Sequence, residues 1–218
     1  MTVKEFPRVW STLKRQVKSL EVPWLEQMSS KKRDPFKVLV SCVLSLRTQD
    51  RVTAEASKRL FRLADNPRAL SKLPVEETEK AIYPVGFYRV KARNIRNISR
   101  EIIERFGGRV PNTIEELLTL KGVGRKTANL VVTRGYNKEG ICVDTHVHRI
   151  TNRWGLIKAK TPYQTEFALR ETVPVRYWKE LNGNLVAFGQ GICKPISPLC
   201  SRCKVSSYCD RVGVTHHR

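Results

Sequence analysis

The sequence predicts an all-α protein, and three observations carry this prediction. Apolar residues recur at helical spacing in most segments, and no stretch alternates apolar and polar residues as a half-buried strand does. Capping residues, glycines and prolines divide the chain into segments of ordinary helix length. Of the 218 residues, 40% are hydrophobic and 28% are charged, which is sufficient for one large or two small helical domains.

The first predicted helix covers residues 3–28, because Phe6, Trp10 and other apolar residues repeat on one face. We interpret this stripe as core packing. A polar and basic linker is expected at residues 29–34, where the chain contains no apolar side chain.

The later helices are predicted from similar stripes and from their end signals. Asp34 and Pro35 begin a strongly apolar helix, and Thr48 or Asp50 can cap the helix that follows it. A loop with two aromatic residues, Gly86 to Tyr88, separates two basic helices. The helices are expected at residues 35–46, 52–63, 67–73, 75–82, 91–106, 113–118, 125–135, 147–154, 161–173 and 177–192.

The stretch Leu120–Leu130, LKGVGRKTANL, predicts a sharp turn between two of these helices. Thr113 and Glu116 form a capping box that starts the first helix. Gly122 and Gly124 lie two residues apart, which favours a tight turn with positive φ. The segment is therefore expected to form a helix, a glycine hairpin and a second helix.

The second helix of the hairpin is expected to begin near Arg125 and to end at Gly135 as its C-cap. Backbone N–H groups at its start can hold a phosphate oxygen. Lys126 lies in the first turn, where the helix dipole and Arg125 should lower the pKa of its amine, and a partly neutral amine can form a Schiff base. The alternative is an ordinary turn with a surface lysine. A P-loop is excluded, because no Gly-Lys-Ser/Thr tripeptide is present.

The charge balance points to a polyanionic partner. The 41 Lys and Arg residues outnumber the 20 Asp and Glu residues, which gives a net charge of +21, and nucleic acid is the commonest partner for such a chain. The alternative is a general bias toward basic residues for solubility or thermostability. The longest uncharged apolar run, Val38–Leu46, has nine residues, half of the ~18 residues that span a bilayer. Since no signal or transit peptide is recognised, we expect a cytoplasmic protein, associated with the nucleoid if the source is prokaryotic.

The segment ICVDTHVHR contains the most suggestive acidic residue. Asp144 precedes an apolar-periodic helix, so its simplest role is that of an N-cap. His146 and His148 lie two residues apart and face different sides of that helix. We therefore expect packing or hydrogen-bonding roles for them, and not a shared metal site.

Four of the six cysteines lie close together in the pattern C-x6-C-x2-C-x5-C, at Cys193, Cys200, Cys203 and Cys209. In a reducing compartment this pattern indicates metal or cluster binding and not disulfides. The spacing favours an iron–sulfur cube over zinc, because zinc sites usually combine two Cys-x-x-Cys pairs, although zinc stays open. Cys42 and Cys142 lie in apolar runs and are expected to be buried free thiols.

Taken together, LKGVGRKTAN, VDTHVHR and the cysteine pattern resemble the endonuclease III family of DNA glycosylases, within the helix-hairpin-helix superfamily. The resemblance extends from about Phe36 to Cys209. It implies two helical domains with a DNA cleft between them. Residues 28–138 would form a central helical barrel that contains the hairpin, and residues 1–27 and 139–218 would form an iron–sulfur cluster domain. It also selects a [4Fe–4S] cluster on the four clustered cysteines.

The resemblance implies a base-excision-repair activity on double-stranded DNA that contains damaged bases or abasic sites. Lys126 would be the nucleophile that attacks C1′ of an extruded nucleotide, and Asp144 would be the catalytic carboxylate. The resulting Schiff base would permit β-elimination, so the protein would be a bifunctional DNA glycosylase and AP lyase. The family's usual substrates are oxidised pyrimidines such as thymine glycol. A monomer is expected.

DNA contacts are expected from three groups of residues. Two positions depart from the family pattern: Arg47 replaces the gap-filling glutamine of L-S-x-Q, with Gln49 two residues on, and Phe87 replaces an aliphatic wedge. The hairpin and the basic residues near the cysteines are expected to contact the DNA backbone. These residues are Gly122, Val123, Gly124 and Arg125, together with Lys194, Arg202 and Lys204.

Three other functions compete with this interpretation. A monofunctional glycosylase for mismatched thymine or uracil is kept open by Arg47. A non-catalytic DNA-binding protein would need neither Lys126 nor Asp144. An electron carrier built on the cluster is disfavoured by the charge of +21, which suits DNA better than a small redox partner.

Overall fold

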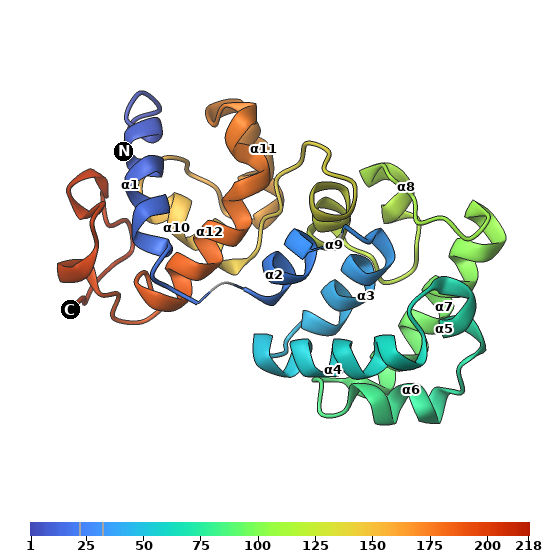
Figure 1. Ribbon diagram of the computed structural model, residues 1–218. Coiled ribbons are helices and arrows are strands. Elements are labelled where there is room, and N and C mark those ends of the chain that lie inside the picture. The colour runs from blue at the N-terminus through green and yellow to red at the C-terminus, as the bar shows by residue number, and fades with distance from the viewer. Residues whose placement is uncertain (22, 32) are drawn as a thin grey trace. The chain divides into compact units, whose positions relative to one another are not determined.

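The computed structural model of the chain describes residues 1–21, 23–31 and 33–218, and every regular element in these ranges is helical (Figure 1). The all-α prediction is confirmed. The α-helices are α1 (Phe6–Val17), α2 (Trp24–Lys31), α3 (Pro35–Ser45), α4 (Asp50–Leu63), α5 (Pro67–Lys72), α6 (Val75–Ile82), α7 (Tyr88–Phe106), α8 (Ile114–Leu118), α9 (Arg125–Leu130), α10 (Thr145–Arg153), α11 (Pro162–Thr172) and α12 (Trp178–Gly191). A π-helical turn, η1 (Val131–Gly135), and the 3-10 turns η2 (Val175–Tyr177), η3 (Cys200–Arg202) and η4 (Ser206–Tyr208) complete the set.

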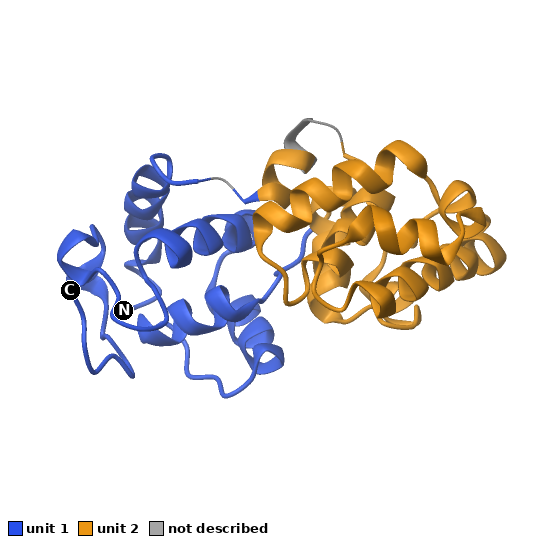
Figure 2. Cartoon of the chain, turned by 90° about the horizontal axis from the view of Figure 1, so that it is seen from below, with its two compact units in different colours: residues 1–23, 139–218 blue, residues 24–138 orange. Residues whose placement is uncertain are grey.

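The chain folds into two compact units (Figure 2). The central unit is Trp24–Lys138, and the terminal unit combines Met1–Pro23 with Glu139–Arg218. Helix α2 packs against α3 and α4, so its first four residues fold with the central unit, although the sequence analysis groups residues up to 27 with the chain ends.

The core of the central unit is built around α3. Eight of its eleven residues are buried, since this helix is apolar on nearly every side. It contacts α2, α4, α7, α9 and η1. Asp34 caps its start by accepting a hydrogen bond from the Lys37 N–H. Helix α9, which carries the hairpin lysine, is thus held against a helix that is buried on nearly every side.

The core of the terminal unit is aromatic. Phe6 and Trp10 of α1 stack at a centroid distance of 5.7 Å, and Trp154 lies against Phe188 of α12. All four side chains are at most 2% exposed. Helix α1 contacts α12, and α12 contacts α10, so the chain start is part of the core that supports the cysteine segment.

The predicted first helix and linker are wrong in their boundaries. Residues 3–28 form parts of two helices, since α1 ends at Val17 and α2 begins at Trp24, just after Pro23, whose missing N–H cannot continue a helix. The predicted linker at 29–34 overlaps the end of α2. Val22 and Lys32, on which parts of these predictions fall, lie outside the described residues.

Two other predictions are corrected around α4 and α7. Neither Thr48 nor Asp50 caps α4. Its N-cap is Gln49, without a side-chain cap, because Asp50 instead accepts a hydrogen bond from the Trp24 N–H. Helix α7 begins at Tyr88, three residues earlier than predicted, since Phe87 takes the left-handed turn that precedes it.

None of the helices in the described ranges combines the length and the apolar character that a bilayer crossing requires.

Candidate functional site

The hairpin joins α8 to α9 as predicted. Thr113 caps α8 by accepting from the Glu116 N–H at 3.3 Å, and its hydroxyl donates to the Glu116 carboxylate at 2.8 Å. After α8 ends, the Val123 N–H donates to the Leu120 carbonyl at 3.0 Å, which closes a tight turn. The side chain of Val123 is buried, so it anchors the turn while the flanking residues stay at the surface.

The two hairpin glycines have different roles. Gly122 has a φ of +86°, and a Cβ there would lie 2.4 Å from the Asn94 side chain. Gly124 has an extended backbone with a φ of −97°, so the expectation of a positive φ holds only for the first glycine. A Cβ on Gly124 would meet no protein atom within 4 Å. The backbone at the start of α9 is thus open to an outside ligand.

The predicted C-cap at Gly135 is wrong. Helix α9 continues into the π-helical turn η1, and the residue after this turn is Tyr136 in a right-handed conformation. Gly135 does not have a positive φ. A Cβ at this position would lie 2.8 Å from Pro35 Cα, so a glycine is required because η1 approaches the start of α3.

Lys126 is the second residue of α9 and is half-buried. Its neighbours fix the backbone that carries it. The buried Thr127 hydroxyl accepts from Cys42 Sγ of α3 at 3.4 Å, and Asn129 Nδ2 donates to the Arg125 carbonyl at 3.2 Å. The first turn of α9 is therefore tied to the core, and Lys126 lies in this turn, two residues after the open position at Gly124.

Asp144 caps α10, as the sequence indicates. One carboxylate oxygen, Oδ1, accepts hydrogen bonds from the N–H groups of His146 and Val147, both at 2.9 Å. These two bonds fix the orientation of the carboxylate, whose exposure is intermediate. Both capping bonds use the same carboxylate oxygen, so the role of Asp144 as an N-cap does not conflict with the predicted role of its carboxylate. Asp144 belongs to the terminal unit and Lys126 to the central unit.

The histidines of α10 form hydrogen bonds, as predicted. His148 Nδ1 lies 2.7 Å from the Thr165 hydroxyl, and His146 Nδ1 lies 3.1 Å from an Arg149 nitrogen. Burial lowers the pKa of Arg149, whose guanidinium also donates to the Cys193 carbonyl at 2.8 Å. Helix α10 is thus connected directly to the first clustered cysteine.

The four clustered cysteines line one cavity, and the remainder of its wall is largely apolar. The wall includes Trp154, Phe188, Ile192 and Leu199. Burial raises the pKa of Cys203 to about 11 and also raises the pKa of Cys209. In the part of the chain that the structure describes, no three histidine, cysteine or acidic side chains are grouped so that they could hold a single metal ion, so the shared cavity of the four cysteines suits a larger group such as a cluster. Cys42 and Cys142 are buried and form no disulfide among the described residues, as predicted.

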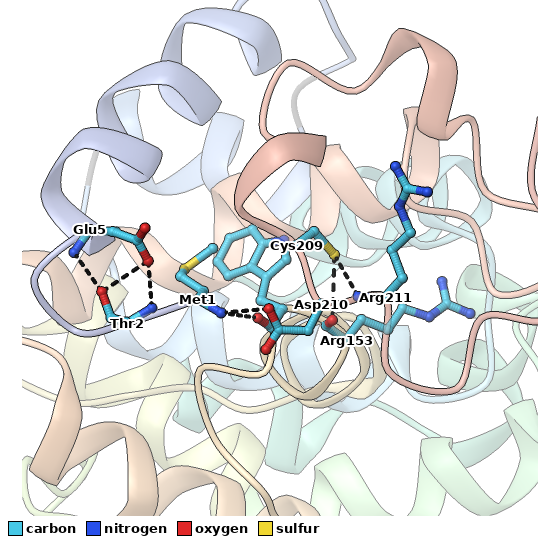
Figure 3. A network of polar contacts seen from close by, with 8 residues as sticks. Met1, Thr2, Glu5, Arg153, Cys209, Asp210 and Arg211 are labelled. Atoms are coloured by element: carbon cyan, nitrogen blue, oxygen red, sulfur yellow. Dashed lines mark hydrogen bonds and ion pairs between the residues drawn. The ribbon is translucent and has the colours of Figure 1, made fainter.

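N–H groups reach two of the clustered sulfurs. Arg153 Nη1 lies 3.5 Å from Cys193 Sγ, and the Arg211 N–H donates to Cys209 Sγ at 3.4 Å. Figure 3 shows the second of these bonds, together with the contact of Cys209 Sγ with the Arg153 carbonyl and the ion pair of the Met1 amine with Asp210. Donors of this kind stabilise anionic sulfur, so the residues fit a group that binds thiolates.

Two residues that the sequence analysis did not single out hold the segment from Cys193 to Cys209, here called the cysteine loop. Arg153, 9% exposed, donates to the carbonyls of Lys194 and Pro195 at 2.7 and 2.6 Å. Gln16 of α1 donates to the Arg202 carbonyl at 2.7 Å and accepts from the Lys204 N–H at 3.1 Å. The sequence signal that could have identified Gln16 and Arg153 is a polar residue on the apolar face of a helix, since a buried polar group requires a hydrogen-bond partner.

The three basic residues predicted to contact DNA lie on this loop. Arg202 and Lys204 are exposed, and Lys194 is half-buried. Gln16 and Arg153 bind backbone atoms of these three basic residues. The loop is therefore fixed by bonds that do not involve the charged side chains.

Two loops of the central unit carry the other predicted DNA contacts. The Arg47 loop, residues 46–49, joins α3 to α4, and the Phe87 loop, residues 83–87, joins α6 to α7. Arg47 and Gln49 are exposed, and Phe87 is 62% exposed. Arg47 and Phe87 have φ values of +52° and +58°, a conformation that disfavours an L residue by roughly 1–2 kcal/mol. The surrounding structure must maintain both.

Lys91 of α7 is a buried cation that the sequence analysis did not single out. Its side chain is 7% exposed, and burial lowers its pKa to about 8. The amine donates to the Leu44 carbonyl at 2.8 Å, to the Leu46 carbonyl, and to the Thr48 hydroxyl at 3.1 Å. The amine therefore supplies hydrogen bonds to carbonyls at the C-terminal end of α3, where the helix itself provides no donors for them.

Comparison with known proteins gives a consistent result. A family model described as HhH-GPD superfamily base excision DNA repair protein matches residues 40–175. An endonuclease III of Thermotoga maritima is 49% identical over 180 residues, which cover 83% of this chain and 84% of the relative.

Solved structures with the same fold include a trapped covalent intermediate of endonuclease III with DNA. It has a TM-score of 0.85 and 31% identity, and the match covers 97% of both chains. A thermostable thymine-DNA glycosylase has a TM-score of 0.81 and 26% identity, with coverage of 95% of this chain and 96% of that one.

Proposed function

The chain belongs to the HhH-GPD superfamily of base excision DNA repair proteins and, within it, to the endonuclease III family, and from this premise we propose that it is a bifunctional DNA glycosylase and AP lyase. The observation that carries the proposal is the place of Lys126. It lies in the first turn of α9, directly after an open glycine turn, in a chain whose relatives include an endonuclease III trapped covalently on DNA.

The proposed reaction begins with extrusion of the damaged nucleotide, because its glycosidic carbon is inaccessible inside the duplex. The neutral Lys126 amine attacks C1′, the bond from C1′ to the base breaks, and the base departs with a proton. The C1′–O4′ bond then breaks as the nitrogen forms a double bond to C1′ and O4′ takes up a proton, which leaves the ring-opened sugar as a Schiff base with Lys126 Nζ. Loss of a C2′ proton expels the 3′ phosphate by β-elimination, and hydrolysis of the Schiff base releases the enzyme.

Asp144 supplies the carboxylate of this mechanism. Positive charge develops on the sugar as the base leaves, and a fixed anion stabilises that charge. The two N–H donors on its Oδ1 hold the carboxylate in one orientation, which reduces the reorganisation that the reaction requires. The carboxylate also assists the proton transfers.

We propose that Cys193, Cys200, Cys203 and Cys209 hold a [4Fe–4S] cluster. Four sulfurs in one cavity, with N–H donors to two of them, support this assignment. When bound, the cluster supplies a structural cross-link. The protein's own contribution is the cysteine loop, whose Lys194, Arg202 and Lys204 are assigned to the DNA backbone.

The hairpin is proposed to bind a DNA phosphate through backbone N–H groups on either side of Val123, whose own N–H closes the turn. Gly124→Ala is expected to weaken affinity for abasic-site duplex about tenfold, because its methyl group obstructs the phosphate and displaces one charge-assisted hydrogen bond. Stability should fall by no more than about 1 kcal/mol, since the fold has room for the methyl group.

Gly122→Ala provides the comparison for this prediction. It is expected to destabilise the protein by about 1–2 kcal/mol, because of the positive φ and the contact with Asn94. Binding titrations and thermal melts of both variants measure the two effects. Equal affinity of Gly124→Ala and the parent protein would argue against a phosphate at this turn.

The proposed substrates are oxidised pyrimidines such as thymine glycol in double-stranded DNA. A second candidate, removal of mismatched thymine or uracil, is favoured by Arg47 and by the similarity to a thymine-DNA glycosylase. The test is a panel of duplexes with thymine glycol, an abasic site, G·T and G·U. Base release with strand cleavage at thymine glycol is the expected result. Release from mismatches without cleavage would support the second candidate, and binding without release would indicate a non-catalytic protein.

The working form is proposed to be a monomer. A net charge of +21 opposes self-association and favours binding to DNA instead. We propose that the protein acts in the cytoplasm or nucleoid, where its proposed substrate, chromosomal DNA, occurs.

A further inference from the structure

The Arg47 loop and the Phe87 loop present two side chains that lie against one another. The Arg47 guanidinium carbon is 5.8 Å from the centroid of the Phe87 ring. The guanidinium is planar, and Phe87 is an exposed aromatic residue. An exposed aromatic ring beside a guanidinium offers two flat surfaces on which an unpaired nucleobase can stack.

Lys91 connects to the Arg47 loop from the protein interior. Its amine has three N–H donors, and the structure supplies three oxygen acceptors, two from carbonyls of Leu44 and Leu46 and one from the Thr48 hydroxyl. In the described residues, no carboxylate forms an ion pair with this lysine, so these oxygens alone compensate it. The acceptors include residues on both sides of Arg47, and the lysine therefore holds the loop at both flanks.

Thr48 joins the two loops. Its hydroxyl accepts hydrogen bonds from Lys91 Nζ and from the Gly86 N–H, both at 3.1 Å. Gly86 approaches the Arg47 loop so closely that a Cβ would lie 2.7 Å from the Arg47 carbonyl. Arg47 and Phe87, each adjacent to a residue of this junction, are thus fixed relative to one another by the bonds of the Thr48 hydroxyl and by the close approach of the two loop backbones.

We infer that Lys91 and Thr48 are positioning residues, which hold Arg47 and Phe87 as one preassembled platform for the unpaired base opposite the extruded nucleotide. The inference rests on the proposed glycosylase function and adds the residues that support its specificity. Because the platform is built before DNA binds, the two left-handed backbone positions need not form during base extrusion.

The test measures single-turnover base release from thymine glycol opposite adenine and opposite guanine. Lys91→Met and Thr48→Val are expected to lower this rate by up to about 10²-fold, because a displaced platform no longer supports the extruded state. The ratio of the release rates opposite adenine and opposite guanine should move toward one. Cleavage of a single-stranded abasic oligonucleotide should be unchanged, because that substrate has no opposite base.

Two further comparisons make the result specific. Lys80→Met removes one positive charge from an exposed position on α6 and should leave both rates at the parental level. In an Arg47→Ala, Phe87→Ala background, adding Lys91→Met should cause no further loss, since residues that act through the same platform are not additive. Thr48→Val removes only one hydroxyl and keeps the test valid if Lys91→Met fails to fold.

Three outcomes would overturn the inference. They are an unchanged duplex rate in Thr48→Val and Lys91→Met, an equal loss on single-stranded and duplex DNA, and full additivity with the Arg47 and Phe87 changes. A parent protein that releases no base from any lesion would instead overturn the proposed function together with this inference.

Discussion

Lys126→Gln is expected to abolish the covalent protein–DNA adduct that borohydride traps on duplex DNA containing thymine glycol. Glutamine keeps the approximate length of the side chain but has no amine to attack C1′, so strand cleavage should fall by at least about 10³-fold. Affinity for the same duplex should change little, because the open turn at Gly124 and the remaining basic residues are retained. Denaturing gels measure the adduct and the nick together.

The matched control for this change is Lys121→Gln, which removes the same charge from an exposed position five residues earlier in the hairpin. Its adduct should persist. If Lys126→Gln still forms an adduct, another amine is the nucleophile. If the parent protein releases base but is never trapped, the protein is a monofunctional glycosylase and Lys126 has a different role.

Asp144→Asn and Asp144→Ala together separate the two roles of this residue. Asparagine is as good an N-cap as aspartate, so Asp144→Asn should unfold at nearly the parental temperature. It lacks the negative charge, and base release should fall by about 10²–10³-fold, the size of effect seen when one preorganised electrostatic group is removed. Asp144→Ala should lose the same activity and about 1 kcal/mol of stability in addition, because the N–H groups of His146 and Val147 lose their acceptor.

Thermal melts and single-turnover base release measure the two effects. The mechanism predicts that the activities of the two variants are alike while their stabilities differ. An Asp144→Asn protein with full activity would reduce Asp144 to a cap of α10, and the carboxylate would then have to come from elsewhere.

Local sequence signals were sufficient for much of the fold. Asp34 before Pro35, and Thr113 before Glu116, cap helices where they were expected to, because an N-cap acts on donors only two or three residues away. Errors arose where distant residues compete for a local group. Asp50 could have capped α4, but it binds the Trp24 N–H, and Thr48 binds Gly86 and Lys91. Such competition cannot be read from spacing.

Two glycines show the same difference between local and distant causes. A positive φ at Gly122 follows from a tight turn and was predicted from the sequence around it. At Gly135 the sequence predicts a C-cap, whereas the structure requires glycine there because Pro35, which is distant in the chain, lies against it. Close approach between distant segments is a tertiary property.

The sequence by itself determined the helical class, the hairpin with Lys126 at the start of its second helix, the cap at Asp144 and the four clustered cysteines, because each depends on residues near one another in the chain. Only the tertiary structure revealed how Gln16 and Arg153 hold the cysteine loop, and how Lys91 and Thr48 tie Arg47 to Phe87. Those contacts join residues that are at least 38 positions apart, and buried polar groups find such partners only when the chain has packed.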